Sequence, residues 1–363
     1  MKAFVINRED LRKNIENIQR KVEVPVIGVL KGDGYGLGML QLAQQLQLCD
    51  VDWFAVTEVN DALALRSYGF EDPHILVMRS TSIDSEVQTL LETKAVATIG
   101  SYDAAVKLNN LAEQAGVIAE AHLKLDTGMG RYGFLPSEFD RILNVYTCFK
   151  NLHITGIYTH FSSSFASKKI TMAQLDQLLH VVDQLKQSEV DPGMVHAANS
   201  TAALRFPETR LDAVRIGSAF TGRSHVKGRS GLVKIGALKS CVIETRWLPA
   251  GHSIGYGGGF VTKRPTEIAV IPVGYIDGFA MEKTRDLFRV RDCLRYLFHD
   301  FKLLLKRKSL TITVAGVKVP VLGHVGMCHT TVDITNMNIH VGDEAVFDLS
   351  PLVVSPNVEK IYE

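Results

Sequence analysis

Short apolar runs alternate with amphipathic stretches along about the first 220 residues of the chain. Runs of four to seven Val, Ile, Leu and Ala residues, bounded by glycine or polar residues, predict buried strands. Apolar residues spaced three and four apart, as between Met172 and Lys186, predict helices that pack on those strands. The predicted strands are Val26–Leu30, Trp53–Val56, Ile75–Met78, Ala95–Ile99, Ala119–Leu125, Ile154–Tyr158, Met194–Ala197 and Leu211–Ile216.

Eight strands with helices between them predict a parallel (β/α)8 TIM-like barrel, although a doubly wound open sheet has the same alternation. Polar residues at the strand ends favour the barrel. Lys31, Lys124, His160, Asn199 and Arg215 each lie at or just after a predicted strand. In a barrel all of them would meet at the C-terminal mouth, whereas an open sheet gathers only some at one switch point. We therefore predict an α/β barrel domain over residues 1–222.

The pattern changes after Gly222, where strands follow one another mostly without long helices between them. Alternating apolar and polar residues, as in Leu310–Val314, are typical of antiparallel β structure. We predict a mostly-β domain over residues 223–363. Its expected strands are Ala237–Arg246, Thr266–Pro272, Leu310–Val321, Thr331–Ile334 and Glu344–Asp348.

One segment of this second domain, Met281–Ser309, has helical rather than strand periodicity, and lysines and arginines fill much of its polar face. A basic amphipathic helix can contact a membrane surface or nucleic acid. The interpretation we favour is that its apolar stripe packs on the domain itself or on a second subunit.

Bulk composition sets the class of protein. The chain has 363 residues, 46% apolar and 22% charged, with a formal net charge of +1, so we expect neither nucleic acid nor a membrane as partner. No apolar run approaches the ~20 residues that span a bilayer, and charges begin at Arg8, too early for a signal peptide. Five scattered cysteines suit free thiols in a reducing cytoplasm, where we expect the protein to act.

The stretch from Val26 to Gly38 carries the first chemical signal. An apolar run ends at Lys31, and four glycines alternate through the next seven residues. A lysine at the end of a buried strand can lose solvation, which lowers its pKa and makes it a nucleophile or base. The alternative is a solvated lysine just past a strand.

Other motifs allow two interpretations each. Arg131, after Gly128 and Gly130, could present its guanidinium to a substrate carboxylate or form a structural ion pair with Asp126. Asn199-Ser200 could cap a helix or bind an anion. His160 and His196 could be core histidines, Tyr256 an exposed aromatic in a glycine-rich turn, and Met327 a core methionine.

In combination these motifs resemble the fold-type III, pyridoxal-phosphate-dependent alanine racemase family over nearly the whole chain. Lys31-Gly32-Asp33-Gly34-Tyr35-Gly36-Leu37-Gly38 is similar to its lysine motif, in which alanines usually replace Gly32 and Gly34 and histidine replaces Leu37. The stretch from His122 to Phe134 is similar to its second signature.

The resemblance implies an isomerase that interconverts L- and D-alanine by a two-base mechanism. Lys31 would form the Schiff base with pyridoxal 5'-phosphate and serve as one base. Tyr256, supplied by the partner subunit of a homodimer, would act from the opposite face of the substrate. Arg131 would bind the substrate carboxylate, and Lys124 could carry a carbamate that orients Arg131.

The same resemblance assigns the cofactor and substrate contacts. Arg215 would face the pyridine nitrogen, and because arginine keeps its protons the cofactor would be a weaker electron sink, which limits transamination. Ser200, Gly217 and Ser218 would contact the phosphate. The remaining implied site residues are Tyr35, His160 and His196 at the cofactor and Tyr275 and Met327 at the substrate; no metal is expected.

Departures from the family pattern leave the substrate open. Between Gly323 and His329, the positions usually held by arginine, cysteine, aspartate and glutamine read His324, Gly326, Cys328 and His329. No C-terminal tyrosine clearly matches the one that touches phosphate in the family. A serine or broad-specificity racemase is therefore an alternative. A non-catalytic cofactor carrier is a further alternative, but a carrier would not need Tyr256. A decarboxylase of the same fold is also possible, but this sequence has no cysteine motif placed to protonate a decarboxylated product.

Overall fold

The computed structural model describes residues 2–223, 231–281, 290–306 and 310–363. The chain divides into two compact units. One comprises Asn7–Ile235, and the other comprises Met1–Ile6 together with Gly236–Glu363. Each unit is described separately below.

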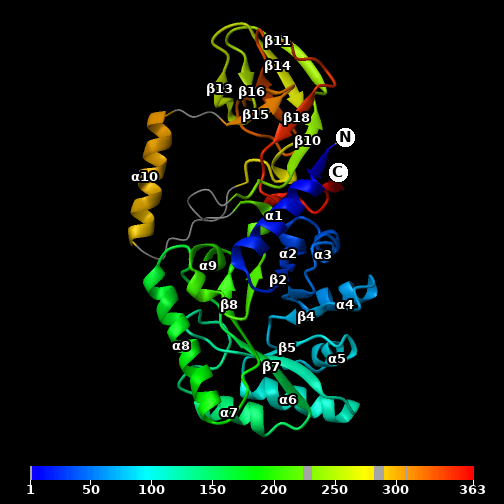
Figure 1. The fold of residues 1–363 in the computed structure, drawn as a ribbon. Coiled ribbons are helices and arrows are strands. Elements are labelled where there is room, and N and C mark those ends of the chain that lie inside the picture. The colour runs from blue at the N-terminus through cyan, green and yellow to red at the C-terminus, as the bar shows by residue number, and fades with distance from the viewer. Residues whose placement is uncertain (1, 224–230, 282–289, 307–309) are drawn as a thin grey trace. The chain divides into compact units, whose positions relative to one another are not determined.

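Within the first unit, whose residues 7–223 are all described, eight parallel strands form one sheet in the order β4-β3-β2-β9-β8-β7-β6-β5 (Figure 1). A parallel bridge between Leu76 and Val96 joins its two edges, with Val77 N donating to Val96 O at 2.9 Å. The predicted (β/α)8 barrel is confirmed. Its strands are β2 (Val26–Val29), β3 (Trp53–Val56), β4 (His74–Val77), β5 (Ala97–Ile99), β6 (Ala119–Lys124), β7 (Leu152–Tyr158), β8 (Met194–Asn199) and β9 (Ala213–Ile216).

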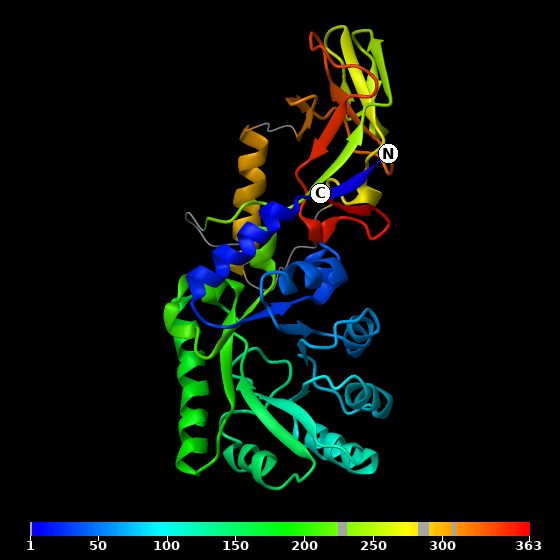
Figure 2. The same cartoon turned by 45° about the vertical axis from the view of Figure 1, so that its right-hand side comes forward.

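Helices surround these strands, and those coloured blue to cyan lie outside the sheet in both views (Figures 1 and 2). Polar caps fix where several begin: the Asn7 side chain accepts from Asp10 N, and Ser101 and Ser167 cap two later helices in the same way. The helices are α1 (Arg8–Val22), α2 (Lys31–Tyr35), α3 (Met39–Gln47), α4 (Val59–Ser67), α5 (Asp84–Glu92), α6 (Tyr102–Ala115), α7 (Phe139–Thr147), α8 (Lys168–Gln187) and α9 (Ser200–Arg205), with 3-10 turns η1 (Pro207–Thr209) and η2 (Ser218–Thr221).

The second unit is mostly β structure, as predicted. Its described residues form a six-stranded sheet ordered β16-β15-β18-β10-β1-β19, a three-stranded sheet ordered β11-β14-β17, and the hairpin β12-β13. The strands are β1 (Ala3–Ile6), β10 (Ala237–Cys241), β11 (Glu244–Leu248), β12 (Ser253–Ile254), β13 (Phe260–Val261), β14 (Thr266–Ile271), β15 (Thr311–Val314), β16 (Val317–Pro320), β17 (Thr330–Asp333), β18 (Glu344–Phe347) and β19 (Glu359–Tyr362). Three short 3-10 turns accompany them, η3 (Tyr256–Gly258), η4 (Tyr275–Asp277) and η5 (Pro351–Val353).

The first strand differs most from the sequence prediction, which placed residues 1–6 with the barrel. β1 runs antiparallel to β10 and parallel to β19, so both ends of the chain complete one sheet. Phe4 and Ile6 are fully buried there. A four-residue apolar run at the chain end has too little periodicity to reveal its partner.

Two predicted strands are each divided. Leu310–Val321 forms the hairpin β15-β16, because Ala315 and Gly316 both adopt positive φ and reverse the chain. Ala237–Arg246 separates into β10 and β11, which belong to different sheets.

Helix α10 (Val290–Lys306) confirms the predicted helix within the described residues, while 282–289 and 307–309 lie outside them. Its apolar side chains do not pack on the described residues of this chain, which was the first of the two placements expected for them. Among the described residues Val290, Leu294, Leu297, Phe298 and Phe301 are 50–78% exposed. None of the helices in the described ranges combines the length and apolar character needed to cross a bilayer.

Candidate active site

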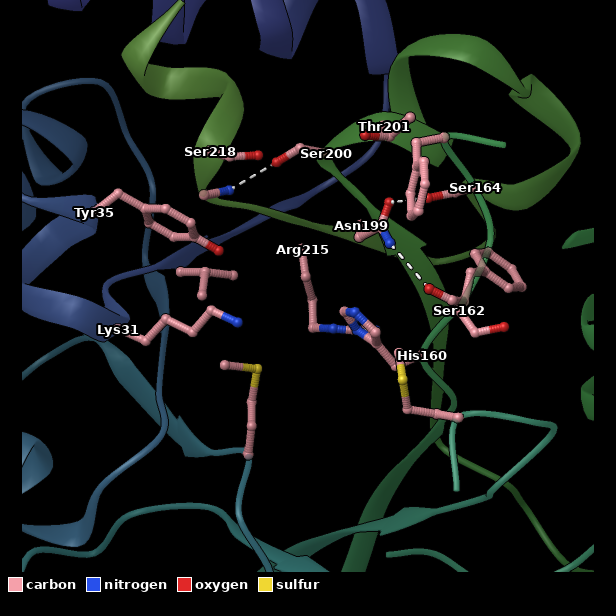
Figure 3. A pocket seen from close by; sticks show the side chains of 16 residues that line it. Lys31, Tyr35, His160, Ser162, Ser164, Asn199, Ser200, Thr201, Arg215 and Ser218 are labelled. Carbon is pink, nitrogen blue, oxygen red and sulfur yellow. Dashed lines mark hydrogen bonds between the residues drawn. The ribbon is translucent and has the colours of Figure 1, made fainter. Parts of the chain in front are cut away.

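A cavity of about 280 Å³ lies at the C-terminal ends of the barrel strands. Seven of the predicted site residues line it, contributed by the segments that follow β2, β7, β8 and β9 (Figure 3). They are Lys31, Tyr35, His160, Ser200, Arg215, Gly217 and Ser218. The sequence therefore brings together at this mouth the residues that it spaces almost 190 positions apart.

Lys31 opens a turn of unusual handedness. The four residues that follow it, Gly32 to Tyr35, all have φ between +52° and +63°, so the chain makes a left-handed turn. Glycine adopts this conformation freely, whereas Asp33 and Tyr35 do so at a cost of about 1–2 kcal/mol each. The Asp33 carboxylate stabilises the exit by accepting from Met39 N at 2.8 Å. Lys31 and Tyr35 consequently extend into the same cavity (Figure 3).

The surroundings of Lys31 favour its neutral amine. Burial lowers the pKa of Lys31, and the nearby positive charges of Arg131 and Arg215 lower it further. An unprotonated amine can act as a nucleophile or accept a proton, which a solvated lysine at neutral pH rarely does. Lys31 is thus partly withdrawn from solvent and faces a cavity, which favours the functional interpretation over the solvated one.

Arg215, on β9, is buried and donates to several acceptors. Its guanidinium donates to His196 Nδ1 and Thr159 O, both at 2.6 Å, and to Ala197 O at 3.0 Å. Burial lowers the pKa of Arg215 to about 10, so it still carries its proton at neutral pH. No carboxylate pairs with it among the described residues. A fixed positive charge thus faces the cavity.

The arginine sets the protonation of a chain of histidines behind it. Because Arg215 can only donate, His196 Nδ1 accepts, and His196 Nε2 therefore carries a hydrogen. His196 Nε2 in turn donates to His122 Nδ1 at 2.9 Å. Burial lowers the pKa of His196 well below its usual value and that of His122 to about 3, so both rings are neutral.

His122 was not singled out by the sequence analysis as a site residue. Its Nε2 is buried without a hydrogen-bond partner, and its ring lies 5.5 Å from the Trp53 ring. Only its position on β6, facing inward two residues before Lys124, could have identified it. It holds His196, and through it Arg215, in place.

Ser200 and Gly217 form the other wall of the cavity. Ser200 Oγ accepts from Gly217 N at 3.0 Å and from Ala219 N at 3.3 Å, which leaves its own hydroxyl hydrogen to donate elsewhere. Gly217 has no room for a side chain, because an added Cβ would lie 2.2 Å from Tyr35 Cε2. This wall offers hydroxyl and amide donors suited to an anion.

Lys124, at the end of β6, is buried between two aromatic rings. Its Nζ lies 5.3 Å from the Tyr132 ring centroid and 5.2 Å from that of Tyr158. Burial, followed by the charges of Arg215 and Arg131, lowers the pKa of Lys124 to about 7. A substantial fraction is then the neutral amine at physiological pH.

The turn after β6 excludes one of the two interpretations of Arg131, the ion pair with Asp126. The Asp126 carboxylate accepts from the backbone N–H groups of Gly128, Met129 and Gly130, at 2.8–3.1 Å. Within the described range 2–223, Asp126 and Arg131 form no ion pair. The carboxylate builds the turn, and the exposed Arg131 guanidinium remains beside the Tyr132 ring at 5.6 Å.

The remaining predicted residues belong to the second unit. Tyr256 is 78% exposed in η3, between the positive-φ residues Gly255 and Gly257. Tyr275 and Met327 lie on adjoining turns, since Tyr275 N donates to Gly326 O and Ile276 N donates to Met327 O. Met327 is about half exposed, so the interpretation of it as a core methionine is wrong.

Comparisons with known proteins point to one family along most of the chain. Family models described as "Alanine racemase, N-terminal domain" and "Alanine racemase, C-terminal domain" match residues 6–225 and 235–351. "Alanine racemase 1" of Clostridium acetobutylicum is 32% identical over 350 residues, which cover 94% of this chain and 84% of that protein.

Solved structures of alanine racemases are also similar to this structure. Alanine racemase of Clostridium difficile superimposes with a TM-score of 0.85 at 26% identity, covering 100% of this chain and 95% of that one. Alanine racemase of Bartonella henselae, solved with covalently bound pyridoxal phosphate, has a TM-score of 0.84 at 21% identity, covering 100% and 99%.

Proposed function

The chain belongs to the alanine racemase family, and from that premise we propose that it interconverts L- and D-alanine with pyridoxal 5'-phosphate. The observation that carries the proposal is the pairing of a lysine of lowered pKa with a buried, protonated arginine in one cavity. A racemase requires a base at Cα and an environment that limits side reactions.

The cavity fits the cofactor. The Ser200 and Ser218 hydroxyls and the Ser218 amide offer donors for its phosphate, while Gly217, whose amide donates to Ser200 Oγ, shapes the wall against which Tyr35 lies. Arg215 presents N–H groups where a ring nitrogen would lie, with His160 and His196 holding its guanidinium. When bound, pyridoxal phosphate supplies an aldehyde that condenses with an amine and withdraws electrons from Cα.

Lys31 then has two tasks, both of which need its neutral form. Its amine would hold the cofactor, and as a free amine it would move a proton to or from Cα of the substrate. Arg215 keeps its own proton at the ring nitrogen, so electron density is not drawn fully into the ring. This favours return of a proton to Cα over transamination.

Lys124 and Arg131 form the proposed carboxylate site. The Lys124 amine, neutral in part at pH 7, can add to dissolved CO2 and release one proton, which gives a carbamate. The carbamate would accept from the Arg131 guanidinium and orient it toward the substrate carboxylate. An intact-mass and peptide measurement that finds only the free amine at Lys124 would exclude this part.

Tyr256 is proposed as the second base, supplied by the other subunit of a homodimer. Its exposure and its glycine-flanked turn support a residue that reaches outward from its own unit. Under this proposal residues 7–222 hold the cofactor and residues 223–363 supply Tyr256, with Tyr275 and Met327 at the substrate. Free cysteines throughout the described chain favour the cytoplasm as its location.

Two measurements test the proposal. Borohydride reduction followed by peptide mapping should place pyridoxal phosphate on Lys31, and no adduct should form in Lys31→Ala. Chiral chromatography of a panel of L-amino acids should then yield D-alanine as the main product. D-serine or several products would instead identify the broader racemase, and an adduct without any D-amino acid would identify a carrier.

The role of Tyr256 is tested by Tyr256→Phe, with Tyr68→Phe as a control at another exposed tyrosine. Losing the hydroxyl should cost at least 100-fold in kcat in both directions, because general acid–base groups contribute roughly 10²–10⁴-fold. Unchanged two-way racemisation would remove Tyr256 from the mechanism.

A further inference from the structure

The apolar face of helix α10 is exposed to solvent, whereas a helix that covers its own domain buries its apolar face. With about 100° per residue, Val290, Leu294, Leu297, Phe298 and Phe301 fall within an arc of about 100°. All five are at least half exposed. The half-buried positions on the described part of the helix lie on the other side and include Asp292, Tyr296 and Asp300. The helix therefore presents its apolar face outward.

Basic side chains border that apolar face along one side. Arg291, Lys302 and Arg295 lie roughly 20–60° beyond its edge on the helical wheel, and all three are exposed. Arg295 also lies 3.5 Å from the half-buried Asp292, but its own side chain is 65% exposed and leaves much of the guanidinium in solvent. Cations beside an apolar stripe match the boundary between lipid headgroups and acyl chains.

The charge of the chain is concentrated in the same region. In the sequence, residues 281–309 hold nine lysines and arginines against four acidic residues. The rest of the chain holds 31 basic and 35 acidic residues, so the overall charge of +1 conceals a positive segment on a negative protein. A positive, apolar surface is complementary to an anionic, apolar one.

We propose that α10 binds the surface of a membrane that contains anionic phospholipid, lying in the interface with its apolar face toward the acyl chains. A second copy of this chain fits the surface less well. In an antiparallel two-fold helix pair, the basic border of one helix would face the same border of the other, and like charges would repel. This inference revises the expectation, drawn from net charge, that no membrane is involved, and it does not depend on the proposed reaction.

Vesicle co-sedimentation of the full-length protein tests the proposal. Vesicles of phosphatidylcholine mixed with phosphatidylglycerol should retain the protein, vesicles of phosphatidylcholine alone should not, and high salt should weaken retention. Leu297→Ser should reduce binding on the order of tenfold. Leu48→Ser is the matched control, because Leu48 and Leu297 are both 65% exposed.

The charge contribution is tested separately. Arg291→Gln combined with Lys302→Gln should weaken binding to anionic vesicles by roughly 30-fold, since each cation near the surface contributes roughly fivefold. Lys150→Gln combined with Lys186→Gln makes the same charge change on exposed barrel positions and should leave binding unchanged. Circular dichroism and melting temperature establish that each variant is folded.

Three results would overturn the proposal. One is absence of binding to anionic vesicles, and another is equal binding to both kinds of vesicle. The third is a light-scattering mass that falls in Leu297→Ser but not in Leu48→Ser, which would assign the face to contact between copies.

Discussion

Replacing Gly217 by alanine tests how the cavity wall is built. The added Cβ would lie 2.2 Å from Tyr35 Cε2, 2.6 Å from Cζ and 2.7 Å from the hydroxyl oxygen. Carbon atoms pack at about 3.5–4.0 Å, so the Tyr35 ring must move by more than about 1 Å. Overpacking of this kind costs about 1–3 kcal/mol, and the displaced ring would occupy the cofactor cavity.

Gly32→Ala is the matched comparison. Gly32 has φ +61° but no atom within 4 Å of its added Cβ, so this substitution carries only a backbone cost of about 1–2 kcal/mol. Both variants should therefore lose similar stability in a thermal melt. Only Gly217→Ala should also lose pyridoxal phosphate affinity, by at least tenfold in a fluorescence titration.

A double substitution separates the clash from other effects. With Tyr35→Ala the ring is absent, so adding Gly217→Ala should cost about 1–2 kcal/mol less than it does in the natural chain. Purely additive free energies of unfolding, or an unchanged cofactor affinity in Gly217→Ala, would refute the reasoning.

Three other variants test further parts of the barrel unit. Burial lowers the pKa of Lys124 from 10.5 to about 7. As the pH rises from about 7 to 10.5, the folded state therefore loses this proton before the unfolded state does, and the stability of the protein increases. Lys124→Met should accordingly stabilise the protein most below pH 7 and progressively less toward pH 10 in CO2-free urea melts; a constant difference would contradict this. Asn14→Ala removes three hydrogen bonds of a fully buried side chain and should cost about 3 kcal/mol. Asn17→Ala removes two exposed bonds, one to Gly231 O and one from Arg20, and should cost about 0.5 kcal/mol; equal costs by urea denaturation would contradict the assignment. Gly156→Ala would place a Cβ 2.7 Å from the backbone oxygen of Met194 and 2.8 Å from His122 Nε2, and should lower stability by about 2 kcal/mol; an unchanged melting temperature would show that both neighbours can move away.

The barrel could be predicted from the sequence because each of its strands is a separate apolar run. Polar residues such as Lys31 and Arg215 directly follow or end those runs, and parallel strands bring their C-terminal ends together. The seven predicted residues that line the cavity could be identified from this rule and the family motifs alone, without knowledge of side-chain packing.

Other features depend on contacts that periodicity does not encode. Glycines around Lys31 predict a turn, but the left-handed φ of Asp33 and Tyr35 is fixed by tertiary structure. His122 sits in an ordinary strand, and only the chain of hydrogen bonds to Arg215 reveals its part. The apolar face of α10 was predicted, whereas its exposure was not, because periodicity identifies a face but not what covers it.

The position of β1 has a consequence for synthesis of the protein. β1 leaves the ribosome long before its two neighbours in the sheet, β10 and β19, which begin at Ala237 and Glu359. At about 5–20 residues per second, the last strand follows tens of seconds after the first. The barrel between β1 and β10 can fold meanwhile, so the hydrophobic strand β1 remains unpaired until β10 has been made, and one of its edges stays open until β19 follows. A nascent chain in this state offers a binding site to chaperones, and a sequence ending before Glu359 would leave β1 as a permanent open edge prone to aggregation.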